Sequence, residues 1–525
     1  MDDASPTPGP AEDRPGPREG APGPGFPPPG FAAAPLRASA AAGEDALAPP
    51  EASADARPGP ARRDTPTLSA PSLFVISNRL PVRRVRREGR SEWARSSGGL
   101  VSALVPALQG RGGTWVGWSG ATGKAPAPFE HDGIGYGTVP LTSAEVDEYY
   151  HGFSNRTLWP LYHDQVRTPE FHRVWWRTYR EVNQRFAEKT AADLRPGDLA
   201  WVQDYHLQLV PSMLRELKPK SRIGFFLHIP FPPLELYGHL PWRREILEGL
   251  LGADVIGFQT RGGAQNFLRC VKRFTTARVV GDTVHHGERE VRVEAFPISI
   301  DFDHFDQTAR SDEVQAKLGR LTKRMNGRRI LLGVDRLDYT KGIDVRLKAF
   351  EGLLERRADA VRDIAFIQIA VPSRETVGEY ADMRSDIEQV VGRINGQHGE
   401  AGLTPIHYLY RSVSAEDLSA YYSAADVMMV TPLRDGMNLV AKEYVASRTN
   451  SDGVLLLSEF TGAARELRTS VLVNPYDVDG TISAIETALD MPDEEVRRRM
   501  RVLRRVVQTN DVHSWSQSFL EALGS

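Results

Sequence analysis

The stretch Thr431-Pro-Leu-Arg-Asp-Gly-Met-Asn-Leu-Val-Ala-Lys-Glu443 has the pattern of a strand that ends in a tight turn and restarts as a helix. It follows the apolar run 427–430, a proline and a glycine mark the turn, and a helical pattern covers 439–446. Free N–H groups at such a helix N-terminus favour a bound anion such as phosphate. Asp435 in the turn and Glu443 within the helix are suited to accept hydrogen bonds from sugar hydroxyls. Taken alone, the stretch also fits an ordinary strand–helix corner with a solvated carboxylate.

Short apolar runs of the same kind recur along the chain and alternate with helical patterns. The other runs lie at 73–76, 199–203, 223–228, 255–258, 330–334 and 364–369. Helical patterns between them include 210–217 and 345–354. Strands that alternate with helices predict an α/β fold with layers around parallel sheets.

The length of 525 residues is too great for one hydrophobic core, so we expect more than one domain. Residues 1–70 hold sixteen of the 37 prolines and few large apolar side chains, which predicts a disordered tail. A stretch poor in regular pattern, 301–325, separates two series of strands and helices. We therefore place one domain at 72–305, a second at 326–500, and the ligand site in the cleft between them. A helical segment at 501–525 is expected to pack back on the first domain.

Composition excludes several classes of protein. The 65 basic and 68 acidic residues nearly cancel, so no global field recruits nucleic acid or a membrane. Cys270 is the only cysteine, which excludes a disulfide framework and CxxC metal sites and fits a reducing cytoplasm. The start Met1-Asp2-Asp3 lacks the basic and apolar regions of a signal peptide, and no later run suits a membrane span. We expect a cytoplasmic protein.

Charged and polar side chains follow the predicted strands by a few residues. They are Arg79, Asp204, His228, Arg336, Arg374 and Asp435. Ligands of open α/β sheets bind at the carboxyl ends of the strands, so this register predicts a site. Each residue taken singly also fits a structural salt bridge or, for His228, a buried core imidazole.

Three further patterns point to a site for a sugar and a diphosphate. Arg336 and Lys341 place two cations in one loop, a combination suited to a diphosphate. Gly98 and Gly99 precede a helical pattern and allow close backbone approach to an anion, although glycine-rich loops are common. Tyr150 and Trp159 offer aromatic surfaces, which are more often core. HExxH and GxSxG are absent, so neither a zinc protease nor a serine hydrolase is indicated.

The chain carries a series of short motifs: SNRLP at 77–81, WVGW at 115–118, DEYY at 147–150, FSN at 153–155, LWP at 158–160, DYH at 204–206, HIPFP at 228–232, RLDYTKG at 336–342 and RDGMNLVAKE at 434–443. Taken together, these motifs resemble those of trehalose-6-phosphate synthases, closest to the bacterial, actinobacterial form. The likeness runs from about residue 73 to the C-terminus and leaves out only the proline-rich tail.

The resemblance implies two Rossmann-like domains facing across a cleft, the GT-B architecture. It also implies transfer of glucose from a nucleotide-glucose to glucose 6-phosphate with retention, without a metal or another cofactor. The donor would be held by Arg336, Lys341, Gly98, Gly99, Asp435, His228, Glu443 (ribose), the backbone near Val413 (base) and the backbone of Leu439, Val440, Ala441 and Lys442. The acceptor would be held by Arg79 and Arg374 at its phosphate and by Tyr150, Trp159 and Asp204 around its sugar. The catalytic roles fall to His228, Asp435, Arg336 and Lys341.

The resemblance leaves several points open. UDP, ADP and GDP donors all remain candidates, because backbone contacts to the base carry no side-chain signature. We expect a homo-oligomer such as a tetramer, and a separate phosphatase that takes the product, since the chain stops at Ser525. The family usually has histidine where this chain has Gln203, and we expect little consequence. A pseudo-glycosyltransferase that couples cyclitols and an inactive sugar-phosphate sensor are the alternatives, and the intact donor and acceptor residues argue against both.

Overall fold

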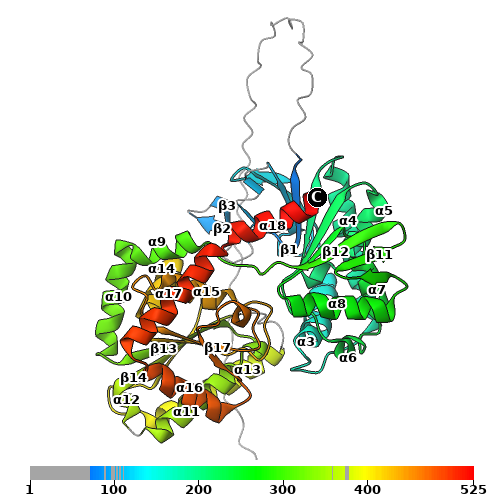
Figure 1. Cartoon of the computed structure of the whole chain (residues 1–525). Helices are drawn as coiled ribbons and strands as arrows, with labels where there is room; N and C mark the ends of the chain where they lie inside the picture. The colour runs from blue at the N-terminus through cyan, green and yellow to red at the C-terminus, as the bar shows by residue number, and fades with distance from the viewer. Residues whose placement is uncertain are drawn as a thin grey trace, which may run out of the picture. The chain divides into compact units, whose positions relative to one another are not determined.

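A computed structural model describes residues 71–525 apart from 88–89, 96–100, 102–103, 106–107, 110–111, 358 and 373–377. The described residues belong to one compact unit. Two largely parallel sheets with helices around them form its framework, which confirms the predicted α/β class with two Rossmann-like domains (Figure 1). The predicted disordered tail, 1–70, lies outside the described residues.

The first sheet has ten strands in the order β10-β11-β12-β9-β8-β7-β1-β4-β6-β5. The strands are β1 (Leu73–Arg79), β4 (Thr114–Trp118), β5 (Phe129–His131), β6 (Ile134–Thr138), β7 (Leu199–Gln203), β8 (Arg222–Leu227), β9 (Val255–Phe258), β10 (Arg278–Val280), β11 (Thr283–His286) and β12 (Arg289–Ala295). Strands β6, β4, β1, β7, β8, β9 and β12 run parallel, and β5, β11 and β10 add antiparallel edges. A separate hairpin pairs β2 (Val82–Arg87) with β3 (Arg90–Arg95).

The second sheet is parallel throughout and has the order β15-β14-β13-β16-β17-β18. Its strands are β13 (Arg329–Arg336), β14 (Ile364–Val371), β15 (Ile406–Tyr410), β16 (Val427–Val430), β17 (Val454–Ser458) and β18 (Val471–Val473). In chain order this is the arrangement 3-2-1-4-5-6 of dinucleotide-binding folds. From β6 to β9 the first sheet has the spatial order β6-β4-β1-β7-β8-β9, which is again 3-2-1-4-5-6 when these parallel strands are numbered along the chain.

The helices fall into two groups according to the sheet that their connections serve. With the first sheet are α2 (Ser143–Glu145), the π-helical segment Val146–Leu158, α3 (Trp159–Tyr162), α4 (Arg173–Asp193), the 3-10 turn Tyr205–Leu207, α5 (Val210–Leu217), α6 (Leu234–Tyr237), α7 (Arg243–Leu250) and α8 (Arg261–Phe274). With the second sheet are α9 (Phe302–Arg310), α10 (Asp312–Met325), the 3-10 turn Tyr339–Lys341, α11 (Ile343–Arg356), α12 (Ala360–Asp363), α13 (Gly378–His398), α14 (Ala415–Ala424), α15 (Leu439–Ser447), the 3-10 turn Ala463–Arg465 and α16 (Val478–Leu489).

The expectation of little regular structure at 301–325 is wrong. Two capped helices occupy it: the side chains of Asp301 and Ser311 accept hydrogen bonds from the first turns of α9 and α10. Each sheet with its helices is called a lobe below. Both helices pack on the second lobe, through α14 and α15. In α10 the residues Val314, Leu318, Leu321 and Met325 recur at helical spacing, a signal that the sequence analysis overlooked.

The last two helices tie the second sheet to the first. Helix α17 (Asp493–Thr509) packs on α15 and α9, and α18 (Val512–Gly524) packs on β8 and β9, where it is drawn in red in Figure 1. The expected boundary at residue 500 therefore falls inside α17. Phe519 of α18 stacks on Trp201 with a centroid distance of 4.3 Å, and a Cβ at Gly224 would lie 2.7 Å from the Phe519 ring. One buried apolar cluster continues from these aromatics into the second sheet.

None of the helices in the described part of the chain combines the length and the apolar character needed to span a bilayer.

Candidate active site

Each sheet has one point where the strand order reverses, and the predicted site residues gather at both. In the second sheet the reversal lies between β13 and β16. Arg336 ends β13, and the loop with Asp435 follows β16. In the first sheet the reversal lies between β1, which ends at Arg79, and β7, which Asp204 follows. Connections at such points diverge to opposite faces and leave a crevice at the carboxyl ends of the strands.

Lys341 and Asp435 form an ion pair at the reversal in the second sheet. The Lys341 ammonium donates to Asp435 Oδ2 at 2.6 Å, and both side chains are largely buried. Asn438 donates to the same carboxylate oxygen at 3.1 Å. Burial raises the pKa of Asp435, but the Lys341 charge outweighs it and the net pKa lies below the usual value. Asp435 is therefore a carboxylate at neutral pH, with its charge balanced by the cation predicted to bind the diphosphate.

A buried arginine holds the two loops of this pair in place. Arg346 on α11 is fully buried and donates to Asp335 Oδ2 at 2.6 Å and to Thr431 Oγ1 at 3.0 Å. It also reaches the carbonyl of Lys341, at 3.4 Å. The sequence analysis missed this residue, because an arginine within a helical pattern is normally expected on the solvent-exposed face of the helix.

The N-terminus of α15 opens on the same loop. Asn438 caps it with a backbone φ of 79°, and its side chain accepts from the Ala441 N–H at 3.1 Å. The helix geometry then leaves the N–H groups of Leu439 and Val440 as the donors of the first turn. The Lys442 side chain is buried and turns away, to Glu466 Oε2 at 2.6 Å and the Ile298 carbonyl at 2.9 Å. An anion at this helix would thus meet backbone groups and not the Lys442 ammonium.

Glu443, the predicted ribose partner, lies on the first turns of α15. Tyr422 donates to Glu443 Oε2 at 2.8 Å. Burial raises the pKa of Glu443, and the Tyr422 hydrogen bond opposes that rise. Val413 lies in the connection between β15 and α14, half-buried against the core. Both positions are at the carboxyl edge of the second sheet.

His228 lies directly after β8, and two consecutive residues at the end of β7 contact it. Asp204 Oδ1 accepts from the His228 backbone N–H at 3.2 Å, and Gln203 Oε1 lies 2.9 Å from His228 Nε2. Asp204 itself has a φ of 72°, a strained value for a residue with a side chain. Burial lowers the pKa of His228 to about 3, so the imidazole is neutral. The expectation that Gln203 has little consequence stays a prediction, and its amide contacts the ring of a candidate catalytic residue.

The His228 segment also meets the Asp435 loop. A Cβ placed on Gly436 would lie 2.2 Å from the His228 carbonyl oxygen. Only a glycine fits such a close approach of two backbones. The structure therefore brings His228, Asp435 and Lys341 into one region.

The predicted acceptor residues form a second cluster at the end of β1. The Arg79 guanidinium lies 4.6 Å from the Trp118 ring centroid and fills the space where Gly120 lacks a side chain. Burial lowers the pKa of Arg79, and the neighbouring Tyr150 opposes this. Tyr150 is tilted against Trp118 at 6.3 Å and stacks on His206 at 5.8 Å. His206 Nδ1 is in turn 4.0 Å from Asp204 Oδ2, which links the cluster to the His228 region.

Trp159 and Arg336 join the two lobes. The Arg336 guanidinium lies 5.8 Å from the Trp159 ring centroid, and Trp159 is 4 % exposed. Gly98, Gly99 and Arg374 lie outside the described residues. The predicted residues in loops after strands lie at the carboxyl ends of the two sheets, and Tyr150 and Trp159 lie on the helical segments that follow β6.

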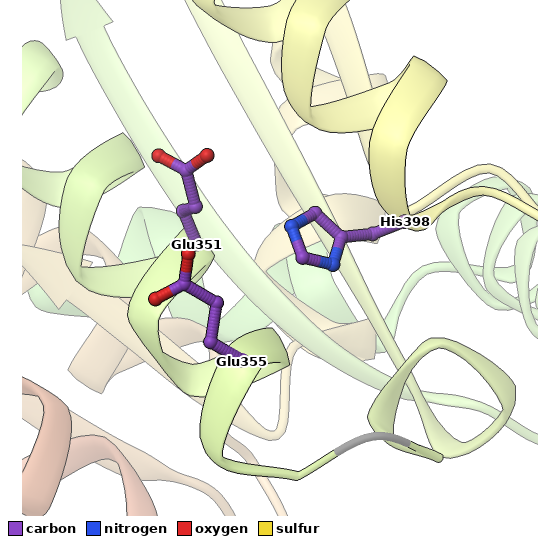
Figure 2. Close-up of side chains that lie close together, drawn as sticks. All are labelled: Glu351, Glu355 and His398. Carbon is purple, nitrogen blue, oxygen red and sulfur yellow. The ribbon is translucent and has the colours of Figure 1, made fainter.

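One group of side chains in the described part of the chain has the spacing of metal ligands. It consists of Glu351 and Glu355 on α11 and His398 at the end of α13, whose ring points toward the two glutamates (Figure 2). Arg393 donates to both carboxylate oxygens of Glu351, one of them at 2.9 Å. Helix α11 starts beside Lys341, so its rise of about 1.5 Å per residue puts Glu351 and Glu355 about 12 and 18 Å further along. We interpret the group as an ion-pair cluster remote from the site, and the independence of catalysis from metal stays a prediction.

Two sheets of order 3-2-1-4-5-6, a cation and a helix N-terminus suited to a diphosphate, and a separate cluster around Arg79 are the features of a glycosyltransferase with two Rossmann-like domains. Residues 71–525 match glycosyltransferase family 20, and the chain belongs to this family. It is a retaining glycosyltransferase, and the resemblance to trehalose-6-phosphate synthases is confirmed.

Similar proteins support this assignment along the whole matched region. The trehalose-6-phosphate synthase of Mycolicibacterium vanbaalenii is 54 % identical over 476 residues, which cover 86 % of this chain and 96 % of the relative. The E. coli protein solved with UDP-2-fluoro glucose is 37 % identical with a TM-score of 0.80, over 86 % of this chain and 99 % of that one. The UDP-forming synthase of Burkholderia xenovorans solved with glucose-6-phosphate is also 37 % identical with a TM-score of 0.80, over 86 % and 100 %.

Proposed function

We propose that the enzyme transfers glucose from UDP-glucose to glucose 6-phosphate and forms α,α-trehalose 6-phosphate. The observation that carries the proposal is the pairing of Lys341 with Asp435 beside the His228 backbone, with the cluster of Arg79 and Trp118 at the strand ends of the first sheet. The two solved relatives that bind a UDP-glucose analogue and glucose-6-phosphate support this choice of substrates.

On the donor side, Arg336, Lys341 and the N–H groups of Leu439 and Val440 bind the diphosphate. The Lys341 charge and the helix N-terminus both stabilise the negative charge that grows there as the glycosidic bond breaks. Glu443, steadied by Tyr422, accepts from the ribose hydroxyls. Gly98 and Gly99 complete the phosphate contacts, and the backbone near Val413 contacts the base.

The donor glucose is held by Asp435 and His228. Asp435 is a carboxylate fixed by Lys341 and Asn438, which suits a hydroxyl acceptor of defined direction. On the acceptor side, Arg79 and Arg374 bind the 6-phosphate, and Tyr150, Trp159 and Asp204 surround the sugar. The Trp118 ring beneath Arg79 limits the freedom of the guanidinium, so little order is lost when phosphate binds.

The chemistry is a front-face displacement within one ternary complex. The bond from the anomeric carbon to the diphosphate breaks while the acceptor hydroxyl forms its bond on the same face. The departing diphosphate oxygen takes the proton of that hydroxyl. Closure of the two lobes excludes water and brings the sugars into contact.

Initial rates with UDP-, ADP- and GDP-glucose against glucose 6-phosphate test this assignment, with the product's anomeric configuration read by NMR. We expect the highest kcat/KM with UDP-glucose and an α,α product. Absence of trehalose 6-phosphate with all three donors would overturn the proposed function, and a cyclitol acceptor preferred over glucose 6-phosphate would favour the pseudo-glycosyltransferase alternative. A homo-oligomer and a separate phosphatase stay predictions.

A further inference from the structure

Gln203 is a buried amide at the end of β7, next to the ring of His228. Strands β7 and β8 run parallel, and Gln203 lies opposite Phe226. The last residue of β7 is therefore next to the end of β8, which His228 follows. Gln203 is fully buried, and its Oε1 lies 2.9 Å from His228 Nε2. The register of the sheet therefore fixes this contact, and no loop has to move to make it.

The contact fixes which nitrogen of the imidazole carries the proton. A neutral imidazole has one N–H, and the amide oxygen that faces Nε2 can only accept, so the tautomer that forms this hydrogen bond is the one with its proton on Nε2. Nδ1 then keeps its lone pair, and no group of the described residues bonds to it. The other faces of the ring meet Phe226 at 4.7 Å and Trp515 at 6.3 Å, which carry no charge that could change this assignment.

The cost of this arrangement shows what the amide contributes. Gln203 Nε2 is buried without a hydrogen-bond partner among the described residues. An unpaired buried donor is destabilising, and an apolar side chain such as methionine would avoid it. Position 203 therefore holds a residue that accepts a hydrogen bond from the His228 ring, although its own Nε2 group is left unpaired.

We propose that Gln203 is a positioning residue that keeps the His228 proton on Nε2, so that Nδ1 accepts a hydrogen bond from a hydroxyl of the donor glucose. That the hydroxyl belongs to a donor glucose rests on the proposed function, whereas the tautomer of His228 does not. A carboxylate at 203 would instead draw a second proton onto the imidazole, and the resulting imidazolium has no lone pair with which to accept.

Kinetics of Gln203→Met and Gln203→Glu test the proposal. We expect Gln203→Met to lower kcat/KM for the nucleotide-glucose about tenfold, with the KM for glucose 6-phosphate unchanged. Gln203→Glu should add an inflection between pH 5 and 8 to the profile of kcat/KM, with activity falling as pH falls. Gln389→Glu, the same change on the exposed face of α13, should leave the profile as in the wild type. Thermal midpoints of all variants separate these effects from misfolding.

Nitrogen-15 NMR of histidine-labelled full-length enzyme gives an independent reading. The His228 signals, assigned by their loss in His228→Asn, should show a protonated Nε2 and a bare Nδ1 in the wild type. A protonated Nδ1, or a Gln203→Glu profile identical to the wild type, would overturn the proposal. If the wild-type enzyme fails to use any nucleotide-glucose while the Nε2–H tautomer is observed, the proposed function fails and the positioning by Gln203 stands.

Discussion

Lys341 Nζ lies 2.6 Å from Asp435 Oδ2, although 94 residues separate the two along the chain. The pair joins the loops after β13 and β16, the two strands between which the order of the second sheet reverses. In the absence of substrate, Lys341 keeps Asp435 ionised and lowers its pKa against the effect of burial. A bound diphosphate would share the same ammonium. In the proposed mechanism, binding of the donor phosphate and orientation of the Asp435 carboxylate would thus be coupled through one side chain.

Replacement of Lys341 by alanine should reduce kcat/KM by about 10² to 10³, or about 2.7–4 kcal/mol, because the charge on the leaving diphosphate then lacks its main counter-charge. Steady-state kinetics with saturating glucose 6-phosphate measure this. Lys348→Ala is the matched control, since this lysine is exposed on α11 and pairs only with Asp344 one turn away. Near-wild-type kcat/KM for Lys341→Ala would remove its assigned role.

Alanine at Gly436 should damage both stability and activity. Its Cβ would lie 2.2 Å from the His228 carbonyl oxygen, and backbone atoms on both sides have little freedom to move. Overpacking of this kind costs about 1–3 kcal/mol, and it would push the sugar-binding loop away from His228. Gly392→Ala serves as the control, because a Cβ there meets nothing within 4 Å and alanine favours the helix. Equal thermal midpoints and equal kcat/KM for the two variants would contradict this prediction.

The sequence predicts the strands well where they are buried on both faces. Parallel strands covered by helices appear as continuous apolar runs, and the run 199–203 coincides with β7. Helix α5 likewise coincides with its predicted span, 210–217. Helix α10 had a usable signal, because Val314, Leu318, Leu321 and Met325 recur at helical spacing, whereas α9 is short and buries Phe302 and Ala309.

Site residues could be predicted as candidates, but their partners could not. The carboxyl-end rule places Arg79, Asp204 and Asp435 at strand ends from the sequence alone. The Lys341–Asp435 pair depends on how two loops fold back toward each other, and the Arg346 network depends on burial. The Gln203–His228 contact had a usable signal, because the two residues sit at the ends of consecutive parallel runs.

Arg79→Met should raise the KM for glucose 6-phosphate about tenfold to a hundredfold, the usual range for one hydrogen-bonded charge. In the wild type, free glucose should be a very poor acceptor, because it offers no anion to the Arg79 guanidinium, whose partial desolvation already lowers its pKa. The variant should therefore discriminate less between the two acceptors. Arg83→Met, on the exposed side of β2, is the control. Comparable turnover of glucose and glucose 6-phosphate by the wild type would rule out this role.

His163 should make the enzyme less stable at acid pH. Burial lowers its pKa to about 4 despite the hydrogen bond to the Trp159 carbonyl, whereas an unfolded histidine titrates near 6.5. Between these values the unfolded state binds more protons, so stability is complete above about pH 6.5 and falls as pH drops toward 4. His163→Gln should flatten the fall by about 1.4 kcal/mol per pH unit in that window. Urea denaturation across pH 4–7 measures it, with His304→Gln on exposed α9 as control; equal slopes in wild type and His163→Gln would contradict the assignment.

The displacement should proceed without a covalent glucosyl-enzyme and without metal. A retaining hydrolase uses a free carboxylate nucleophile roughly 5 Å from its acid partner. Here Asp435 is tied to Lys341 and Asn438, and Asp204 Oδ1 accepts from the His228 backbone, so both candidate carboxylates already accept hydrogen bonds that lower their nucleophilicity. Intact-protein mass spectrometry after incubation with donor alone should therefore show no hexose adduct, and EDTA should leave kcat unchanged.

Two outcomes decide the last prediction separately. A hexose adduct mapped to Asp435 or Asp204 would replace front-face attack by double displacement and would leave the substrates and product as proposed. Loss of activity in EDTA that a divalent cation restores would instead add a metal to the diphosphate site. The Glu355→Gln variant would then show whether the cluster of Figure 2 is involved, because removing that ligand should abolish the restoration only if the ion binds there.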